Sequence, residues 1–325
     1  MNNEDVLTLL RRYPVKNPKV TFLRHNENRT YRVDDEVGNR FLLRVHEPFR
    51  EGMRGLQHSA KGLFEELTML EALQNQGTVL AQKPLRNNAG ELITTIEEND
   101  KQNHCSLLTW LEGRDVLNED LDKPELAKTL GHELANLHAF FRTYPHSGMA
   151  HRPSQGLTHN LDLVSSIQVG HRLGLFTDDT VETVDQTIRL INSRLEAIKD
   201  DPTYWGLIHG DLVQGNILLS PEGKLSFIDY GFWGSGFYLT DVAMGALLLP
   251  FELRDMFVQS YLGQSHVTEE ILLHIEGLMI CAIIGFYTFQ MDNENVHAGM
   301  KEKLPRQCRE LFVPFLQGER IFYHI

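Results

Sequence analysis

The sequence predicts an α+β protein in two parts: a small N-terminal antiparallel sheet with one helix, and a larger, mostly helical C-terminal part. Short apolar runs that suit strands are concentrated before residue 110, and helical periodicity dominates from about residue 122. The helical part is interrupted by one predicted hairpin. We therefore divide the chain into residues 1–110 and 111–325.

Five runs in the N-terminal part have the composition of β-strands. They are residues 20–23, 30–33, 41–45, 91–96 and 105–110. A helix is predicted over 61–76, because leucines recur there at helical spacing and Gly77 can end it. Further helices are predicted over 180–199, 253–261, 269–289 and 306–316, and around the leucines of 126–141.

The composition limits the classes of partner. A net charge of −13 and a pI near 5.6 argue against nucleic acid and anionic membranes, which bind clustered Lys and Arg. The charge suits a cationic substrate only weakly, because solubility alone is the favoured explanation for an acidic chain. The three cysteines are far apart in the sequence, which favours a reducing compartment.

Two further observations lead us to expect a cytoplasmic protein. The first ten residues, MNNEDVLTLL, carry acids where an export signal needs Lys or Arg. The longest apolar run, residues 278–289, is too short to cross a bilayer and is typical of a buried helix.

Residues 206–236 combine strand, loop and turn signals with the polar residues of one particular chemistry. The segment reads GLIHGDLVQGNILLSPEGKLSFIDYGFWGSG, and Asn216 follows Asp211 by five positions. A turn over 220–223 joins the apolar runs 217–219 and 225–228 into a hairpin, which Asp229 follows. Folding this hairpin back on itself brings Asp211, Asn216 and Asp229 together.

These three side chains are those that phosphoryl transfer requires. One Asp accepts the proton of an attacking hydroxyl, while an Asn and a second Asp hold Mg²⁺ against nucleotide phosphates. Mg²⁺ takes hard oxygen ligands, few of them from protein. The alternative is that Asp211 and Asp229 are ordinary loop residues, since turns favour Asp and Gly; the matched spacing of three functional types argues against it.

The motifs HGDLVQGN and IDYG resemble those of the aminoglycoside phosphotransferase family, with its relatives choline kinase and type II homoserine kinase. The resemblance implies a two-lobed, protein-kinase-like fold with a nucleotide in the cleft. It also implies Mg²⁺ with ATP as cofactor, GTP being possible, and a small hydroxyl-bearing acceptor such as an amino alcohol, amino acid, sugar or aminoglycoside. Asp211 would then be the proton acceptor, and Asn216 and Asp229 the metal ligands.

The resemblance also assigns phosphate-binding residues in the N-terminal lobe. Arg44 stands on the third strand where the pattern usually has Lys, and pairs there with a helical Glu. Glu66 is that Glu rather than Glu65, because it falls on the apolar face of its helix and needs a partner. The loop before the second strand lacks glycines, so backbone N–H groups near Asn28 would contact phosphate. A solvent-facing Arg44 and a plain polar turn are the alternatives.

The remaining assignments concern the hinge and the supports of the loop. By position, Trp110 and Leu111 correspond to the hinge that reads the adenine edge through its backbone. Asp241 would hold the catalytic loop, and His209 would pack beneath it. His138 is interpreted as a packing or surface residue, and residues 147–160 as a substrate-facing insertion.

Three functions compete at this stage. A small-molecule kinase is favoured over a Ser/Thr protein kinase, because only nine residues separate Gly231 from Asp241 and no Ala-Pro-Glu segment follows. The third is a non-catalytic nucleotide or metabolite-binding module, which the complete set of Asp211, Asn216 and Asp229 opposes. The oligomeric state and the acceptor are not readable from the sequence.

Overall fold

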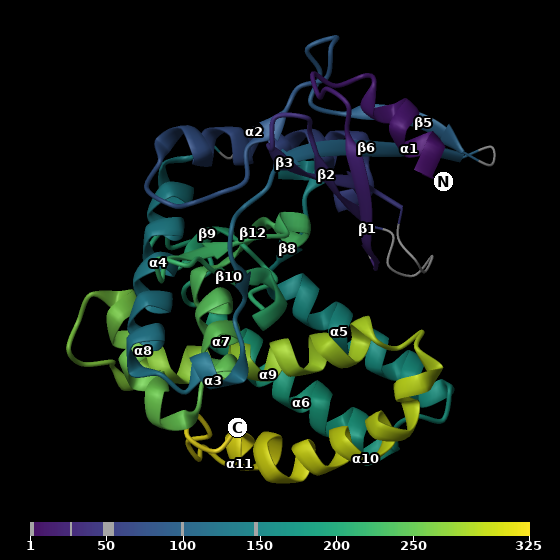
Figure 1. Cartoon of the computed structure of the whole chain (residues 1–325). Helices are drawn as coiled ribbons and strands as arrows, with labels where there is room; N and C mark the ends of the chain where they lie inside the picture. The colour runs from purple at the N-terminus through teal and green to yellow at the C-terminus, as the bar shows by residue number, and fades with distance from the viewer. Residues whose placement is uncertain (1–2, 27, 48–54, 99–100, 146–148) are drawn as a thin grey trace.

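The computed structural model describes residues 3–26, 28–47, 55–98, 101–145 and 149–325. An antiparallel sheet with α1 (Asn3–Leu10) and α2 (Ala60–Gln76) lies above a large helical part, as Figure 1 shows. The predicted α+β, protein-kinase-like class is confirmed.

The N-terminal sheet has six strands in the order β1-β2-β3-β6-β4, with β5 also paired to β6, and all pairs are antiparallel. The strands are β1 (Lys19–His25), β2 (Arg29–Asp34), β3 (Arg40–Val45), β4 (Pro84–Leu85), β5 (Thr94–Glu98) and β6 (Lys101–Thr109). The prediction of five strands was wrong by one. β4 has two residues, too few to show alternation.

The two faces of this sheet have different covers. Leu43 and Val45 of β3 belong to a cluster with residues of α1, whereas Arg44, next to them, lies on the opposite face because side chains alternate along a strand. Helix α2 covers that second face. It begins at Ser59, whose hydroxyl accepts the N–H of Gly62, and ends at Gly77 in the left-handed conformation.

The C-terminal part is built from helices of very different lengths. They are α3 (Asn118–Leu121), α4 (Pro124–Thr143), α5 (Leu157–Arg172), α6 (Asp178–Leu195), α7 (Tyr238–Leu248), α8 (Phe251–Leu262), α9 (Glu269–Phe289), α10 (His297–Gln307) and α11 (Val313–Leu316). The sequence analysis did not predict α5, because polar residues interrupt its apolar stripe.

Helix α9 has the bounds predicted for it, 269–289, and begins before the apolar run of residues 278–289. Within the described ranges it alone is long and apolar enough to cross a membrane by length and composition, and 56% of its most apolar window is buried inside the protein. It packs against α5, α6 and α7. Its apolar surface is therefore accounted for by the core.

Two small sheets carry the loops of the predicted site. One has the order β11-β10-β7 and the other β8-β12-β9. Their strands are β7 (Arg114–Asp115), β8 (Ser154–Gln155), β9 (Trp205–Ile208), β10 (Ile217–Leu219), β11 (Leu225–Phe227) and β12 (Gly234–Phe237). β10 and β11 form the predicted hairpin, closed by a hydrogen bond of 3.0 Å from the Gly223 N–H to the Ser220 carbonyl.

The larger apolar cluster runs without interruption from α2 and β6 into the C-terminal helices. The two lobes therefore share buried surface. The division at residue 110 into two domains stays a prediction.

Candidate active site

The loop between β9 and β10 brings Asp211 and Asn216 into contact. The side-chain amide Nδ2 of Asn216 donates to the Asp211 carboxylate at 2.8 Å and to its backbone carbonyl at 2.9 Å. The far end of the hairpin is tied to the same point, since the Ile228 N–H donates to the Asn216 carbonyl at 3.0 Å. The hairpin thus folds back as predicted and places Asp229 beside the loop.

The charge state of Asp211 suits proton transfer near neutral pH. Burial raises its pKa to about 7, the neighbouring Asp229 carboxylate adds to the shift, and the hydrogen bond from Asn216 opposes it. A general base works best when its pKa lies close to the working pH.

Asp229 and Asn216 offer oxygen atoms that fit Mg²⁺. Because Nδ2 of Asn216 faces Asp211, its Oδ1 is left as an acceptor, and the Asp229 carboxylate has no hydrogen-bond or ion-pair partner within the described part of the chain. Among those residues no cluster of three or more His, Cys, Asp or Glu could hold a metal. A two-residue set is what Mg²⁺ uses when phosphates and water complete its octahedron. The metal roles of both residues stay predictions.

His209 lies fully buried under the loop as a neutral imidazole. Its Nε2 donates to the Ile228 carbonyl at 3.1 Å, and its Nδ1 accepts the Asp211 N–H at 3.3 Å. Burial lowers its pKa, so it stays uncharged. These contacts join the end of the hairpin's second strand to the residue that would accept the proton.

Asp241, at the start of α7, holds the same loop from below. Its carboxylate accepts the N–H groups of His209 at 2.7 Å and Gly210 at 2.9 Å, and Nε2 of His138 at 2.9 Å. Burial by itself raises the pKa of Asp241, but the hydrogen bond and charge of His138, with the other donors, hold it below its usual value. The expected contact between Asp241 and the catalytic loop is present.

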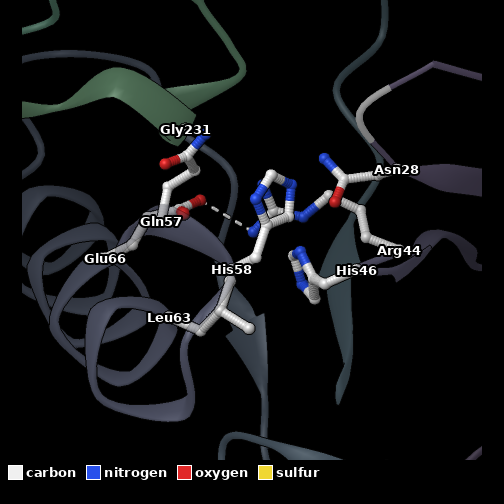
Figure 2. A pocket seen from close by; sticks show the side chains of 8 residues that line it. All are labelled: Asn28, Arg44, His46, Gln57, His58, Leu63, Glu66 and Gly231. Atoms are coloured by element: carbon white, nitrogen blue, oxygen red, sulfur yellow. Dashed lines mark ion pairs between the residues drawn. The ribbon is translucent and has the colours of Figure 1, made fainter. Parts of the chain in front are cut away.

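The N-terminal lobe contributes a buried ion pair. Nη2 of Arg44 lies 2.8 Å from Oε1 of Glu66, and Nε of Arg44 donates to the Ser106 hydroxyl at 3.3 Å. Figure 2 shows this pair in a small pocket with Asn28, His46 and other polar side chains. The ion pair is present and involves Glu66 rather than Glu65. The role of Arg44 in binding phosphate stays a prediction.

The other predicted nucleotide contacts lie along the rim between the lobes. Asn28 lines the pocket of Arg44, and its Oδ1 is buried without a hydrogen-bond partner among the described residues; Glu27 lies outside them. At the hinge, the Trp110 N–H donates to the Arg40 carbonyl at 3.1 Å, whereas Leu111 makes no backbone hydrogen bond within the described ranges. Leu111 is therefore the better candidate for reading the adenine edge.

Three residues near the site were missed or misjudged from the sequence. His138, interpreted as a packing or surface residue, does pack in the interior, and its Nε2 also donates to Asp241, a contact that the sequence did not predict. Gln155 donates to the Gly210 carbonyl at 2.8 Å. Arg152, expected in a substrate-facing insertion, is only 2% exposed and points into the protein. Ser147, where that insertion was expected to begin, lies outside the described residues.

The sheet lobe, the helical lobe and the loop between them that carries Asp211 have the arrangement of a protein-kinase-like fold. A sequence model of the phosphotransferase enzyme family matches residues 19–273. The chain belongs to this family.

Two curated relatives match parts of the chain. The chain is 27% identical over 232 residues to an uncharacterized protein of Deinococcus radiodurans, and 28% identical over 170 residues to a probable ketoamine kinase of Vibrio parahaemolyticus. These matches cover 71% and 50% of this chain, and 62% and 55% of the lengths of the two relatives.

Solved structures share the fold over nearly the whole chain. A microcompartment-associated aminopropanol kinase superposes with a TM-score of 0.77 at 19% identity, covering 98% of both chains. An amicoumacin kinase superposes with a TM-score of 0.74 at 17% identity, covering 95% of this chain and 93% of its own. At such identities the likeness establishes the fold alone.

Proposed function

We propose that this protein transfers the γ-phosphoryl group of Mg²⁺-ATP to the hydroxyl of a small, amine-bearing molecule. The observation that carries the proposal is Asp211, with a pKa near 7, hydrogen-bonded to Asn216 and beside Asp229. The pKa of Asp211 suits proton exchange. The Asp229 carboxylate, which has no partner among the described residues, would be free to bind the metal.

In this reaction the acceptor oxygen attacks the γ-phosphorus, the bond from phosphorus to the bridging oxygen breaks, and ADP leaves. Asp211 orients the hydroxyl and takes its proton. Arg44, held by Glu66, binds the α- and β-phosphates, and Leu111 binds the adenine edge. Asn216 and Asp229 would hold Mg²⁺, which would supply charge neutralisation during the transfer.

The acceptor class is supported mainly by relatives. The net charge of −13 is compatible with a cationic substrate. Named neighbours include an aminopropanol kinase, an ethanolamine kinase and a choline kinase, and a curated relative is a probable ketoamine kinase. A peptide acceptor fits less well, because the residues after Gly231 continue directly into β12, which is hydrogen-bonded to both β8 and β9.

The test follows ADP release from ATP and Mg²⁺ with matched pairs of amino alcohols and neutral alcohols. Wild type should use at least one amino alcohol and prefer it to its neutral partner. Asp211→Asn should lower turnover by about 10²–10⁴-fold while still binding Mg²⁺-ATP. Asp162→Asn, on the exposed face of α5, is the matched control and should retain activity. Mg²⁺-ATP binding without turnover of any acceptor would instead support the non-catalytic module.

A further inference from the structure

Arg152 uses its guanidinium to hold the loop that follows Asp229. Its Nη2 donates to the carbonyls of Tyr230 and Gly231, each at 2.7 Å, and its Nε donates to the Trp233 carbonyl at 2.8 Å. One side chain, which is 2% exposed, thereby holds three backbone carbonyls of this loop. Hydrogen bonds from a buried cation are among the stronger ones in proteins.

The same guanidinium also reaches helix α2. Its Nη1 donates to the Gly62 carbonyl at 3.1 Å and lies 3.8 Å from Oε2 of Glu66. Glu66 thus faces two cations, Arg44 on one side and Arg152 on the other. Glu66 and Gly231, the residues that Arg152 connects, both line the pocket of Figure 2.

The backbone around Arg152 is seated between two glycines. A Cβ on Gly62 would lie 2.7 Å from the His151 carbonyl oxygen, and a Cβ on Gly234 would lie 2.0 Å from that of Pro153. Any side chain at either position would push the segment away. The close packing of Gly62 and Gly234 against residues 151 and 153 therefore fixes the backbone position of Arg152.

We propose that Arg152 is a positioning residue that holds the metal-binding Asp229 against helix α2, whose Glu66 pairs with the phosphate-binding Arg44. This inference rests on the proposed function. Asp229 has φ of 63°, a left-handed conformation that is strained for a non-glycine residue. Such a conformation persists only where its surroundings hold it. Arg152 supplies that constraint through the carbonyls of the next two residues, and it ties the loop to Glu66.

The experiment titrates ATP calorimetrically, with and without Mg²⁺, into wild type, Arg152→Met and Arg152→Lys. We expect Arg152→Met to weaken ATP binding about tenfold in Mg²⁺ and less than about twofold without it. Lys retains the charge but cannot span four carbonyls, so Arg152→Lys should give a smaller loss of the same kind. Because Arg152 acts through Asp229, adding Arg152→Met to Asp229→Asn should weaken binding no further.

Arg254 is the matched control. It is 3% exposed and its guanidinium also donates only to carbonyls, those of Leu249, Phe322 and Ile325, which join α8 to the last residues of the chain. Arg254→Met should lower the melting temperature and leave ATP affinity unchanged. Equal affinities for Arg152→Met and wild type, or additive losses with Asp229→Asn, would overturn the inference alone. Failure of wild type itself to bind ATP with Mg²⁺ would overturn the proposed function and the inference together.

Discussion

Asp211 lies in the loop before β10 and Asp241 holds that loop; Asp241 is buried and Asp211 half-buried, yet their pKa values move in opposite directions. Asp241 accepts two backbone N–H groups and the Nε2–H of His138. Asp211 accepts one side-chain N–H, from Asn216, and faces a second carboxylate, Asp229. Burial penalises both charges, so the number of donors and the sign of the neighbouring charge decide the outcome.

Asp241 supports the loop, whereas Asp211 has the properties of a proton acceptor. Asp241 stays ionised because its lone pairs are occupied by donors, and it therefore fixes the backbone of His209 and Gly210. Asp211 is left with spare acceptor capacity and a pKa of about 7, which is what a proton acceptor needs. The two residues can be tested by the same substitution.

The largest destabilisation by a single substitution is expected when Asn replaces Asp241. Asp241→Asn removes the charge and turns an NH₂ group toward buried donors, so about 3 kcal/mol of unfolding free energy should be lost. Asp211→Asn should be neutral or stabilising at pH 8, because it relieves the repulsion from Asp229 and retains the Asn216 hydrogen bond. Urea denaturation of both variants and of wild type measures whether each substitution lowers or raises the free energy of unfolding. Equal destabilisation by the two substitutions would refute the distinction.

The raised pKa of Asp211 should be visible in how the stability of the protein depends on pH. Its folded pKa of about 7 lies above the unfolded value of an aspartate, so the folded state binds more protons between these values. Stability should therefore be greatest near pH 4 with respect to this group and fall as the pH rises toward 7, by up to about 4 kcal/mol. The measurement compares wild type with Asp211→Asn in EDTA from pH 4.5 to 8. A constant difference between the two curves would contradict the raised pKa.

The sequence was informative wherever the site is local. The contact between Asp211 and Asn216 follows from their spacing in the one loop before β10, and the position of Asp229 follows from the hairpin that comes next in the chain. The ion pair of Arg44 and Glu66 could be predicted because an acid on an apolar helix face needs a cation. In each case a periodicity or a turn signal links the partners.

The supports of the site could not be predicted in this way. His138 and Asp241 are 103 residues apart, and Arg152 and Trp233 are 81 apart. Their pairing depends on how α4 and the segment before α5 pack against the loops, which no local pattern records. Arg152 gave no signal because a surface arginine and a buried one look the same in a sequence.

Tyr261 offers the smallest and most specific test of the Asp241 network. Its hydroxyl donates to Nδ1 of His138 at 2.8 Å, so the imidazole presents its Nε2–H to Asp241. Tyr261→Phe should cost about 1 kcal/mol by leaving a buried acceptor unpaired. Tyr287→Phe, which removes a hydroxyl that donates to Gln307 at 2.7 Å, is the matched control outside the network. If the tyrosine orients the histidine, combining Tyr261→Phe with Asp241→Asn should cost less than the sum of the two, whereas Tyr287→Phe should add fully. Full additivity at both tyrosines would show that Asp241 holds the loop without help from His138 and Tyr261.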